Sequence, residues 1–269
     1  MYYTYGTGSP LGETGFDAYT SADLKHWSQP FPVFRAPEDF WGDRDFWAPE
    51  VHRYNGRYYL FGSFSAGPGS RGTHILASDS PRGPFLPLGE RAQTPADWMC
   101  LDGTLYVDER DTPWMVFCHE WVQVTDGRMC AVRLTDDLSA AVGEPVELFR
   151  ASQAPWVRPI GVDPRGCVTD GPWLHRLASG VLIMLWASFD EGGNYGLALA
   201  RSASGTLAGP WEHDLEPLFS EDGGHGMLFT TFDGKKMISF HKPNHGAPAR
   251  PIFRHIKETE RGIRILNEE

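Results

Sequence analysis

Four short stretches of the chain carry a carboxylate or an imidazole beside small residues, where an ordinary buried strand would carry apolar side chains. Each of these ionisable groups stands about eight to twelve residues before an aromatic or aliphatic run. An unpaired charge inside a protein is costly, so such groups are expected to converge on a site or a metal-lined channel. The four groups are Glu50, Asp102, Asp170 and His225.

The elements that must position these groups repeat along the chain. An apolar run, preceded in four of its five copies by a turn pair, begins at Tyr2, Tyr58, Trp114, Leu182 and Lys236, with spacings of 56, 56, 68 and 54 residues. A second marker, a strand-end turn, begins at positions 21, 78, 135 and 202, with spacings of 57, 57 and 67 residues. Two independent markers with the same period indicate a structural repeat.

Each repeat has room for about four short strands and shows no long helical period. Five such units predict an all-β fold, a five-bladed β-propeller that forms one domain over residues 1–269. Two packed sheets are the alternative, but they would not explain the period. Within each repeat, the stretch before the turn pair is expected to be the innermost strand, which faces the central axis. The four ionisable groups lie on these stretches.

The composition of the chain disfavours some classes of binding partner. The chain has 24 Lys+Arg against 35 Asp+Glu, a formal net charge of −11, which disfavours nucleic acid and anionic membranes as partners. No apolar run reaches the roughly 18 residues of a spanning helix, and Met1 is not followed by a leader pattern. We therefore expect a cytoplasmic protein, or a secreted one if the natural N-terminus lies upstream. The cysteines are expected to be reduced packing thiols; they are Cys100, Cys118, Cys130 and Cys167.

The innermost-strand motifs give the chain a family resemblance that covers essentially its whole length. The chain resembles glycoside hydrolase family 43, five-bladed propellers that cleave plant polysaccharides containing arabinose and xylose. The order of the motifs is more specific than any one of them. The motifs are Trp47-Ala48-Pro49-Glu50-Val51-His52, Leu101-Asp102-Gly103-Thr104-Leu105, Thr169-Asp170-Gly171-Pro172 and Gly224-His225-Gly226.

The resemblance implies an inverting glycosidase with three carboxylates: a base in blade one, a tuning Asp in blade three and an acid in blade four. Asp102 matches the tuning Asp. The alternative interpretation is that Asp102 and Gly103 form an ordinary Asp-Gly turn. Asp170 stands where the family has a Glu acid, and its side chain is one methylene shorter. Glu120, just after the Trp114 strand, is the competing acid or a ligand of sugar hydroxyls.

The base motif of the family, Arg-Asp-Pro on the innermost strand of blade one, has no counterpart in this sequence. The resemblance therefore implies a first blade without its innermost strand. Asp17 and Asp45 are the nearby carboxylates that could substitute for the base. The open edge predicts a weakened ring, a partner strand from Ile252 to Leu266, or a homodimer formed by strand exchange through the first blade.

Aromatic and basic residues near the innermost strands are candidates for sugar binding. Trp47 and Trp121 are expected to stack on pentose rings, and Asp17 is a further candidate contact. Arg158 could clamp a sugar hydroxyl or pair with a carboxylate; pairing with Asp170 would defeat an acid role. His225 matches an axial His of the family and is either a hydrogen-bonded structural residue or a ligand of a central calcium. No cofactor is expected to be required.

The predicted function is the removal of terminal pentoses from plant oligosaccharides, as an α-L-arabinofuranosidase or a β-xylosidase does. An endo-acting arabinanase is the close alternative, and a groove in place of a pocket would identify it. A carbohydrate-binding pseudoenzyme of the same fold, without a base, is the alternative of a different class.

Overall fold

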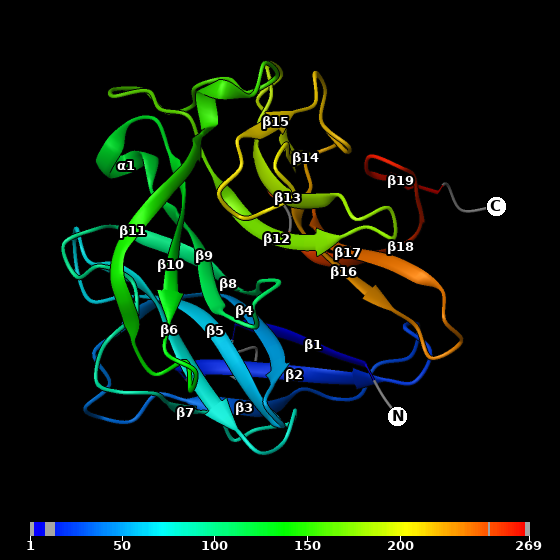
Figure 1. The fold of residues 1–269 in the computed structure, drawn as a ribbon. Coiled ribbons are helices and arrows are strands. Elements are labelled where there is room, and N and C mark those ends of the chain that lie inside the picture. Colours follow the sequence, from blue (N-terminus) through cyan, green and yellow to red (C-terminus); the bar gives the residue numbers. More distant parts are fainter. Residues whose placement is uncertain (1–2, 9–13, 247, 267–269) are drawn as a thin grey trace. The chain divides into compact units, whose positions relative to one another are not determined.

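The computed structural model describes residues 3–8, 14–246 and 248–266 of the chain, and their secondary structure is almost entirely strand (Figure 1). The helices among these residues are α1 (Trp121–Val124) and a 3₁₀ turn (Ala151–Gln153). The strands form one sheet of three strands and four sheets of four strands, each ordered as in the sequence. The all-β prediction is therefore confirmed, and four sheets have the strand number that the repeat predicts.

The strand bounds follow sheet by sheet. The first sheet contains β1 (Tyr3–Gly8), β2 (Gly15–Ser21) and β3 (Phe31–Arg35), and the second contains β4 (Arg44–Tyr54), β5 (Arg57–Ser65), β6 (Arg71–Ser78) and β7 (Leu86–Pro87). The third contains β8 (Cys100–Val107), β9 (Pro113–His119), β10 (Arg128–Leu134) and β11 (Ala141–Arg150). The fourth contains β12 (Asp170–Arg176), β13 (Leu182–Phe189), β14 (Tyr195–Ser202) and β15 (Trp211–His213). The fifth contains β16 (Gly224–Thr230), β17 (Lys236–Lys242), β18 (Arg250–Glu258) and β19 (Ile263–Ile265).

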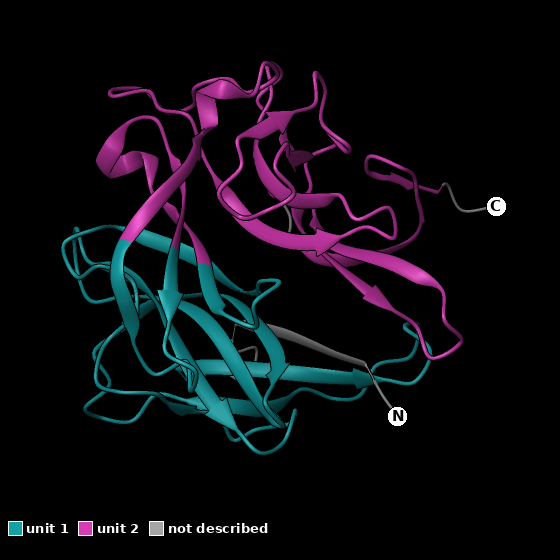
Figure 2. Cartoon of the chain, in the orientation of Figure 1, with its two compact units in different colours: residues 1–115, 132–144 teal, residues 116–131, 145–269 magenta. Residues whose placement is uncertain are grey.

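The chain divides into two compact units (Figure 2). Unit 1 comprises residues 1–115 and 132–144, and unit 2 comprises residues 116–131 and 145–269. Unit 1 holds the first two sheets, unit 2 holds the last two, and the boundaries between the units fall within β9, β10 and β11.

The turns that mark the repeat join the strands as the period predicts. Asn55 and Gly56 form the two-residue connection between β4 and β5, with φ angles of 45° and 82°. A tight hairpin of this kind needs left-handed backbone at both central residues, which Asn and Gly adopt most easily. The second set of turns leads into the last strand of each of the first four sheets.

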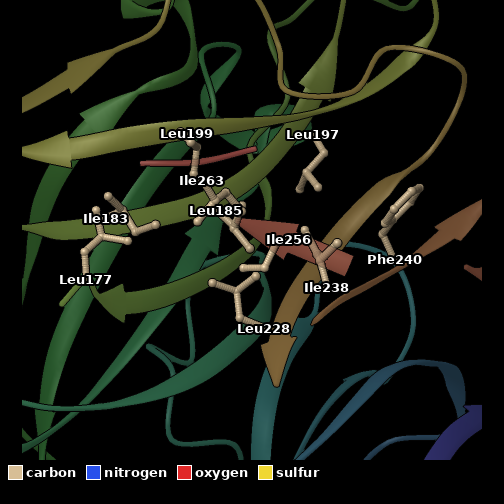
Figure 3. Packing of buried hydrophobic residues seen from close by; sticks show 10 residues of the cluster. All are labelled: Leu177, Ile183, Leu185, Leu197, Leu199, Leu228, Ile238, Phe240, Ile256 and Ile263. Carbon is tan, nitrogen blue, oxygen red and sulfur yellow. The ribbon is translucent and has the colours of Figure 1, made fainter. Parts of the chain in front are cut away.

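Each unit has its own apolar core. In unit 1, Phe16 and Phe34 of the first sheet pack with Leu60 and Phe64 of the second. In unit 2, the fourth and fifth sheets share a core (Figure 3). Burial of one Leu or Ile side chain stabilises a fold by about 1.5–3 kcal/mol, so these clusters hold neighbouring sheets together. The cluster of Figure 3 comprises Leu177, Ile183, Leu185, Leu197, Leu199, Leu228, Ile238, Phe240, Ile256 and Ile263.

One topological prediction is wrong. The segment from Ile252 to Leu266 is one of the three predicted ways to treat the edge of the first blade, but it forms β18 and β19 instead. β18 pairs with β17 over Arg250 to His255, and β19 pairs with β18. The segment fills the outer half of its own sheet because Ile256 and Ile263 reach the unit 2 core from there.

The cysteines agree with the prediction of reduced packing thiols. All four cysteines are free thiols; Cys100, Cys118 and Cys130 are buried. Burial raises the pKa of the Cys130 thiol to about 12, so it stays protonated and packs as a small apolar group. Over the described ranges, no helix is long and apolar enough to cross a membrane.

Candidate active site

The first strand of each four-stranded sheet has a residue with left-handed backbone within its sequence motif, and β4 has a second one, Asp45, before its motif. The residues within the motifs are Ala48 in β4, Asp102 in β8, Gly171 in β12 and His225 in β16, with φ angles of 49°, 55°, 53° and 53°. The pairing of β4, β12 and β16 with the next strand shifts register at this point, as in a β-bulge. Bulges re-aim side chains and are frequent beside active sites. The four positions therefore share a left-handed backbone, and four predicted site residues lie at or next to them: Trp47, Asp102, Asp170 and His225.

Asp102 is itself the left-handed residue of β8, in unit 1. Its side chain is partly buried, and its backbone N–H donates to Ser63 Oγ at 2.8 Å. A left-handed aspartate is uncommon and is retained where the surroundings hold it, often at functional sites. This setting also argues against the alternative of a plain Asp-Gly turn, because Asp102 lies inside a strand.

Glu50, the carboxylate of the Trp-Ala-Pro-Glu motif, ties β4 to β8 within unit 1. Thr104 Oγ1 donates to Glu50 Oε1 at 2.5 Å, and His52 Nε2 is hydrogen-bonded to the same oxygen. Leu105 N also contacts His52 Nε2, at 3.4 Å. Glu50 is thus engaged in holding the strand that carries Asp102.

Trp47 is the most exposed aromatic residue of the first-strand motifs, with 45% of its surface exposed. The Arg71 guanidinium lies 4.4 Å from the centroid of the Trp47 ring and is itself held by Asp45 at 2.9 Å and by Ser65 at 3.1 Å. Burial raises the pKa of Asp45, but the hydrogen bonds from Arg71 and Ser65 outweigh it and leave this pKa below its usual value. One face of the indole is therefore supported by a fixed cation.

Asp170 is the first residue of β12 in unit 2 and lies one position before the bulge. The Tyr195 hydroxyl, from β14, donates to Asp170 Oδ2 at 3.0 Å. Tyr195 is buried, and its ring stacks on His241 with a centroid separation of 5.6 Å. Because Oδ2 accepts this hydrogen bond, a proton on the carboxyl group is directed to Oδ1, where it can be given to a leaving group.

Gly171 and His225 pack against each other in unit 2. A Cβ on Gly171 would lie 2.7 Å from His225 Cγ, so a side chain at this position would clash. Burial lowers the pKa of the neighbouring His241; its hydrogen bond to Asn244 opposes this shift, and the charge of His225 adds to it. A neutral His241 ring adds no full positive charge beside Tyr195, the residue that holds the Asp170 carboxyl group.

His225 is the predicted ligand of a central calcium. No group of three or more His, Cys, Asp or Glu residues is close enough to hold a metal in the described ranges. Calcium takes six to eight oxygen ligands in proteins, and His225 offers nitrogen. A calcium ligand at His225 stays a prediction.

Glu120 and Trp121 lie together at the end of β9. Glu120 is buried and precedes α1, where its backbone C=O accepts from the N–H groups of Gln123 and Val124 at 3.0 and 3.2 Å. The Trp121 ring packs closely over Gly161 and Gly166. Trp121 therefore has the contacts of a packing residue on this side, while Glu120 remains a buried carboxylate beside a helix start.

Two further candidates are held by ion pairs. Arg158 donates to the carbonyl oxygens of Pro155 and Val157 and pairs with Glu191 at 3.8 Å; across the part of the chain that the structure describes, its partners do not include Asp170. Asp17 is buried on β2 and accepts from Arg35 at 2.5 Å. Arg158 thus leaves the acid role of Asp170 open, and Asp17 has the setting of a buried structural ion pair.

Sequence reasoning missed Tyr195, Ser63 and Arg71. Tyr195 stands 25 residues after Asp170, and no motif links the two. Ser63 has a weak signal, because each apolar run ends in small residues, but nothing in the pattern assigns a partner to its hydroxyl.

Comparisons with known proteins agree with this geometry. Residues 1–261 match the family model of glycosyl hydrolases family 43. The crystal structure of an endo-arabinase from Bacteroides thetaiotaomicron is 46% identical and superposes with a TM-score of 0.91, covering 96% of this chain and 91% of that chain. An endo-1,4-β-xylanase structure from the same organism, 24% identical with a TM-score of 0.80, covers 99% of this chain and 91% of that chain and shows the shared fold.

The chain is also similar in sequence to a curated relative. The extracellular endo-α-(1→5)-L-arabinanase 1 of Bacillus subtilis is 25% identical over 158 residues, which are 54% of this chain and 48% of the relative. The match thus spans about half of that protein's length. The family model, in contrast, covers nearly the whole chain. The chain belongs to glycoside hydrolase family 43 and has the all-β propeller fold of its relatives.

Proposed function

We propose that this protein hydrolyses α-L-arabinofuranosyl linkages in arabinan or in oligosaccharides derived from it, with inversion at the anomeric carbon. The observation that carries the proposal is the 46% identity, over nearly the full length of both chains, to the structure of an endo-arabinase. This similarity favours arabinan over xylan as the substrate class. It also favours internal cleavage over the terminal cleavage that the sequence motifs predict.

We assign the acid role to Asp170 and the tuning role to Asp102. Asp170 gives its proton to the glycosidic oxygen as the bond to the anomeric carbon breaks, while a water molecule attacks that carbon and loses a proton to a base. The hydrogen bond from Tyr195 supports this role because it leaves Asp170 Oδ1 as the site of the transferable proton. In the tuning role that the family resemblance implies, the negative charge of Asp102 raises the pKa of the acid. Glu120 is the second candidate for the acid.

The base is the role that no described residue fills with clear support. Asp17 and Asp45 are the predicted substitutes, and each accepts from an arginine, Arg35 and Arg71 respectively. The lowered pKa of Asp45 makes it a weak base. Asp17 is fully buried in its ion pair with Arg35. These observations favour a second candidate function, a carbohydrate-binding protein that keeps the fold and the aromatic platform without turnover.

We further propose that the protein has five blades and that β1, β2 and β3 are the second to fourth strands of the first blade. The turn between β2 and β3 corresponds to the turns that join the third and fourth strands of the following sheets, which supports this alignment. In this arrangement the innermost strand of the first blade is the one without a counterpart in this sequence. Trp47, supported on one face by Arg71, is the proposed stacking platform for a pentose ring.

Product analysis tests the function. The protein is incubated with linear arabinan, arabino-oligosaccharides, arabinoxylan and xylan, and the products are separated by anion-exchange chromatography. The expected products are short arabino-oligosaccharides from arabinan, with the inverted anomer seen first by NMR. Release of arabinose alone indicates terminal cleavage, and preferential cleavage of xylan contradicts the proposal. Binding of arabinan by calorimetry without any product identifies the binding protein.

A further inference from the structure

Two hydroxyl groups of the second sheet lie against the backbone of Asp102 in unit 1. Ser63 in β5 and Thr73 in β6 are direct partners in the register of these two strands, and both are fully buried. Ser63 Oγ accepts from the Asp102 N–H at 2.8 Å, and Thr73 Oγ1 accepts from the Gly103 N–H at 3.0 Å. We call Ser63 and Thr73 the hydroxyl pair.

The left-handed backbone of Asp102 makes this arrangement necessary. In a regular strand, successive N–H groups point to opposite sides, whereas a left-handed residue lets two consecutive N–H groups turn toward the same side. Two buried donors on one side must both find acceptors, since an unpaired buried N–H is costly. Side chains on adjacent strands supply two acceptors at the required spacing.

Thr73 is held in place by hydrogen bonds of its own backbone. Thr73 N donates to Thr94 Oγ1 at 3.2 Å, and Thr73 O accepts from Gln93 N at 3.1 Å. A Cβ on Gly103 would lie 2.6 Å from Thr73 Cγ2, so the glycine lets the β8 backbone approach the hydroxyl pair. The Thr73 acceptor is therefore fixed by contacts that do not involve Asp102.

We propose that Ser63 and Thr73 are positioning residues of the glycosidase reaction: by holding the amides of Asp102 and Gly103, they set the direction of the Asp102 carboxylate. The proposal rests on the tuning role of Asp102 in the proposed function. Neither hydroxyl touches the substrate. The two hydroxyl groups act through the backbone of β8. Because both groups are neutral, they add no charge that would alter the pKa of Asp102 directly.

The variants that test this are Ser63→Ala, Thr73→Val and Thr73→Ser. Thr73→Val keeps the shape of the side chain without the hydroxyl, and Thr73→Ser keeps the hydroxyl with a smaller side chain. Ser188→Ala is the matched control, because Ser188 is also fully buried on a strand while its Oγ has no hydrogen-bond partner among the residues described. Each variant is compared with the wild type by circular dichroism to verify folding.

Two readouts separate positioning from structure. We expect kcat on arabino-oligosaccharides to fall about tenfold or more in Ser63→Ala and Thr73→Val, with KM changed less than about twofold, because small misplacements of a catalytic group are costly. The alkaline limb of the kcat/KM profile should move to lower pH, since a displaced Asp102 holds up the pKa of the acid less. Thr73→Ser should restore most of the activity, and Ser188→Ala should change neither readout.

Hydrogen exchange of the backbone amides, followed by NMR, tests the contact without any substrate. The Gly103 amide should exchange at least about tenfold faster in Thr73→Val, and the Asp102 amide likewise in Ser63→Ala. Unchanged exchange would overturn the hydroxyl pair as a holding device. Faster exchange with an unchanged pH profile and kcat would overturn the positioning role. A folded wild type that cleaves no arabinofuranosyl substrate would instead overturn the proposed function and the catalytic part of this proposal, while the exchange rates still decide the contact.

Discussion

The first strands β8 and β12 each contain a left-handed residue but use it in two different ways. In β8 the carboxylate, Asp102, is the left-handed residue itself, and the neutral hydroxyls of Ser63 and Thr73 hold its backbone. In β12 the left-handed residue is Gly171, and the carboxylate, Asp170, comes one residue earlier, where Tyr195 holds its side chain. One carboxylate is thus fixed through its main chain and the other through its own oxygen.

This difference suits the two proposed roles. A tuning carboxylate acts through its charge and must stay ionised at a fixed place, which backbone contacts achieve without altering its proton affinity. An acid must present a proton from one defined oxygen, which a hydrogen bond to the other oxygen achieves. A repeated backbone feature therefore supports different chemistry when the ionisable side chain is moved by one position along the strand.

The largest expected effect is that of Asp102→Asn. This change removes the charge but keeps the shape, so the backbone contacts with the hydroxyl pair remain. Turnover of arabino-oligosaccharides should fall about 10³-fold, within the range typical of acid–base groups. Steady-state kinetics and thermal unfolding of the same preparation measure the effect, and a variant that keeps a tenth of the wild-type kcat would remove Asp102 from the mechanism.

The second expected effect is on the Tyr195–Asp170 contact. Tyr195→Phe removes the donor to Asp170 Oδ2, so kcat should fall about tenfold as the carboxyl group loses its orientation. A lost hydrogen bond to the ionised form raises the pKa of the acid, so the alkaline limb of the kcat/KM profile should move to higher pH. This direction is opposite to the one expected for Thr73→Val. A shift of both variants in the same direction would show that the two strands do not differ as described.

A third prediction concerns the bulge of β12. Gly171→Ala places a Cβ 2.7 Å from His225 Cγ at a φ of 53°, so it should lower the free energy of unfolding by about 1–3 kcal/mol. Gly180→Ala is the matched control, because its backbone is also left-handed but nothing lies within 4 Å of the added atom. Urea unfolding measures both. Equal losses of unfolding free energy in the two variants would mean that backbone strain alone, and not the contact with His225, accounts for the requirement for glycine at position 171.

The smallest effect concerns the far end of β12, where Glu258 accepts from His175 at 2.7 Å, from the Ala178 N–H and from Lys236. Burial raises the pKa of Glu258, but the hydrogen bonds from Lys236 and His175 outweigh it and lower this pKa from 4.5 to about 2. The stability that these contacts contribute is therefore fully present above pH 4.5, the pKa of an unperturbed Glu, and is lost as the pH falls through about 2. Glu258→Gln should destabilise by about 1 kcal/mol at pH 7.

The pH dependence of that difference is the check on Glu258. Unfolding of the wild type and of Glu258→Gln is followed by circular dichroism between pH 7 and pH 2, and the two curves should converge at the acidic end. If the free energies of unfolding of the two proteins differ by the same amount at pH 7 and at pH 2, the ion pairs of Glu258 are not the source of the difference.

Much of the fold could be predicted because its cause is local. Period-two apolar runs and turn pairs such as Asn55-Gly56 act over a few residues, and their repetition reveals the sheets. The position of Ile252 to Leu266 could not be predicted in this way. Its place depends on which core its isoleucines fill, and that is a tertiary property.

The candidate site was predictable only in part. The motifs identified Asp102 and Asp170 because each stands beside glycine on a first strand. The contacts that distinguish the two residues come from other strands: Thr73 is 30 residues from Gly103, and Tyr195 is 25 residues from Asp170. Such pairs depend on register, and a hydroxyl in a strand looks the same in sequence whether or not a backbone amide lies opposite it.

The most direct test of the account is the dependence of Asp170→Asn on the leaving group, with Glu120→Gln measured in parallel. A substrate with a poor leaving group, such as an arabino-oligosaccharide, needs a proton from the acid, whereas a dinitrophenyl arabinofuranoside departs without one. We expect Asp170→Asn to lose about 10³-fold on the oligosaccharide and about tenfold or less on the dinitrophenyl substrate. Full activity of Asp170→Asn on both substrates, with the selective loss in Glu120→Gln, would contradict it and assign the acid to Glu120.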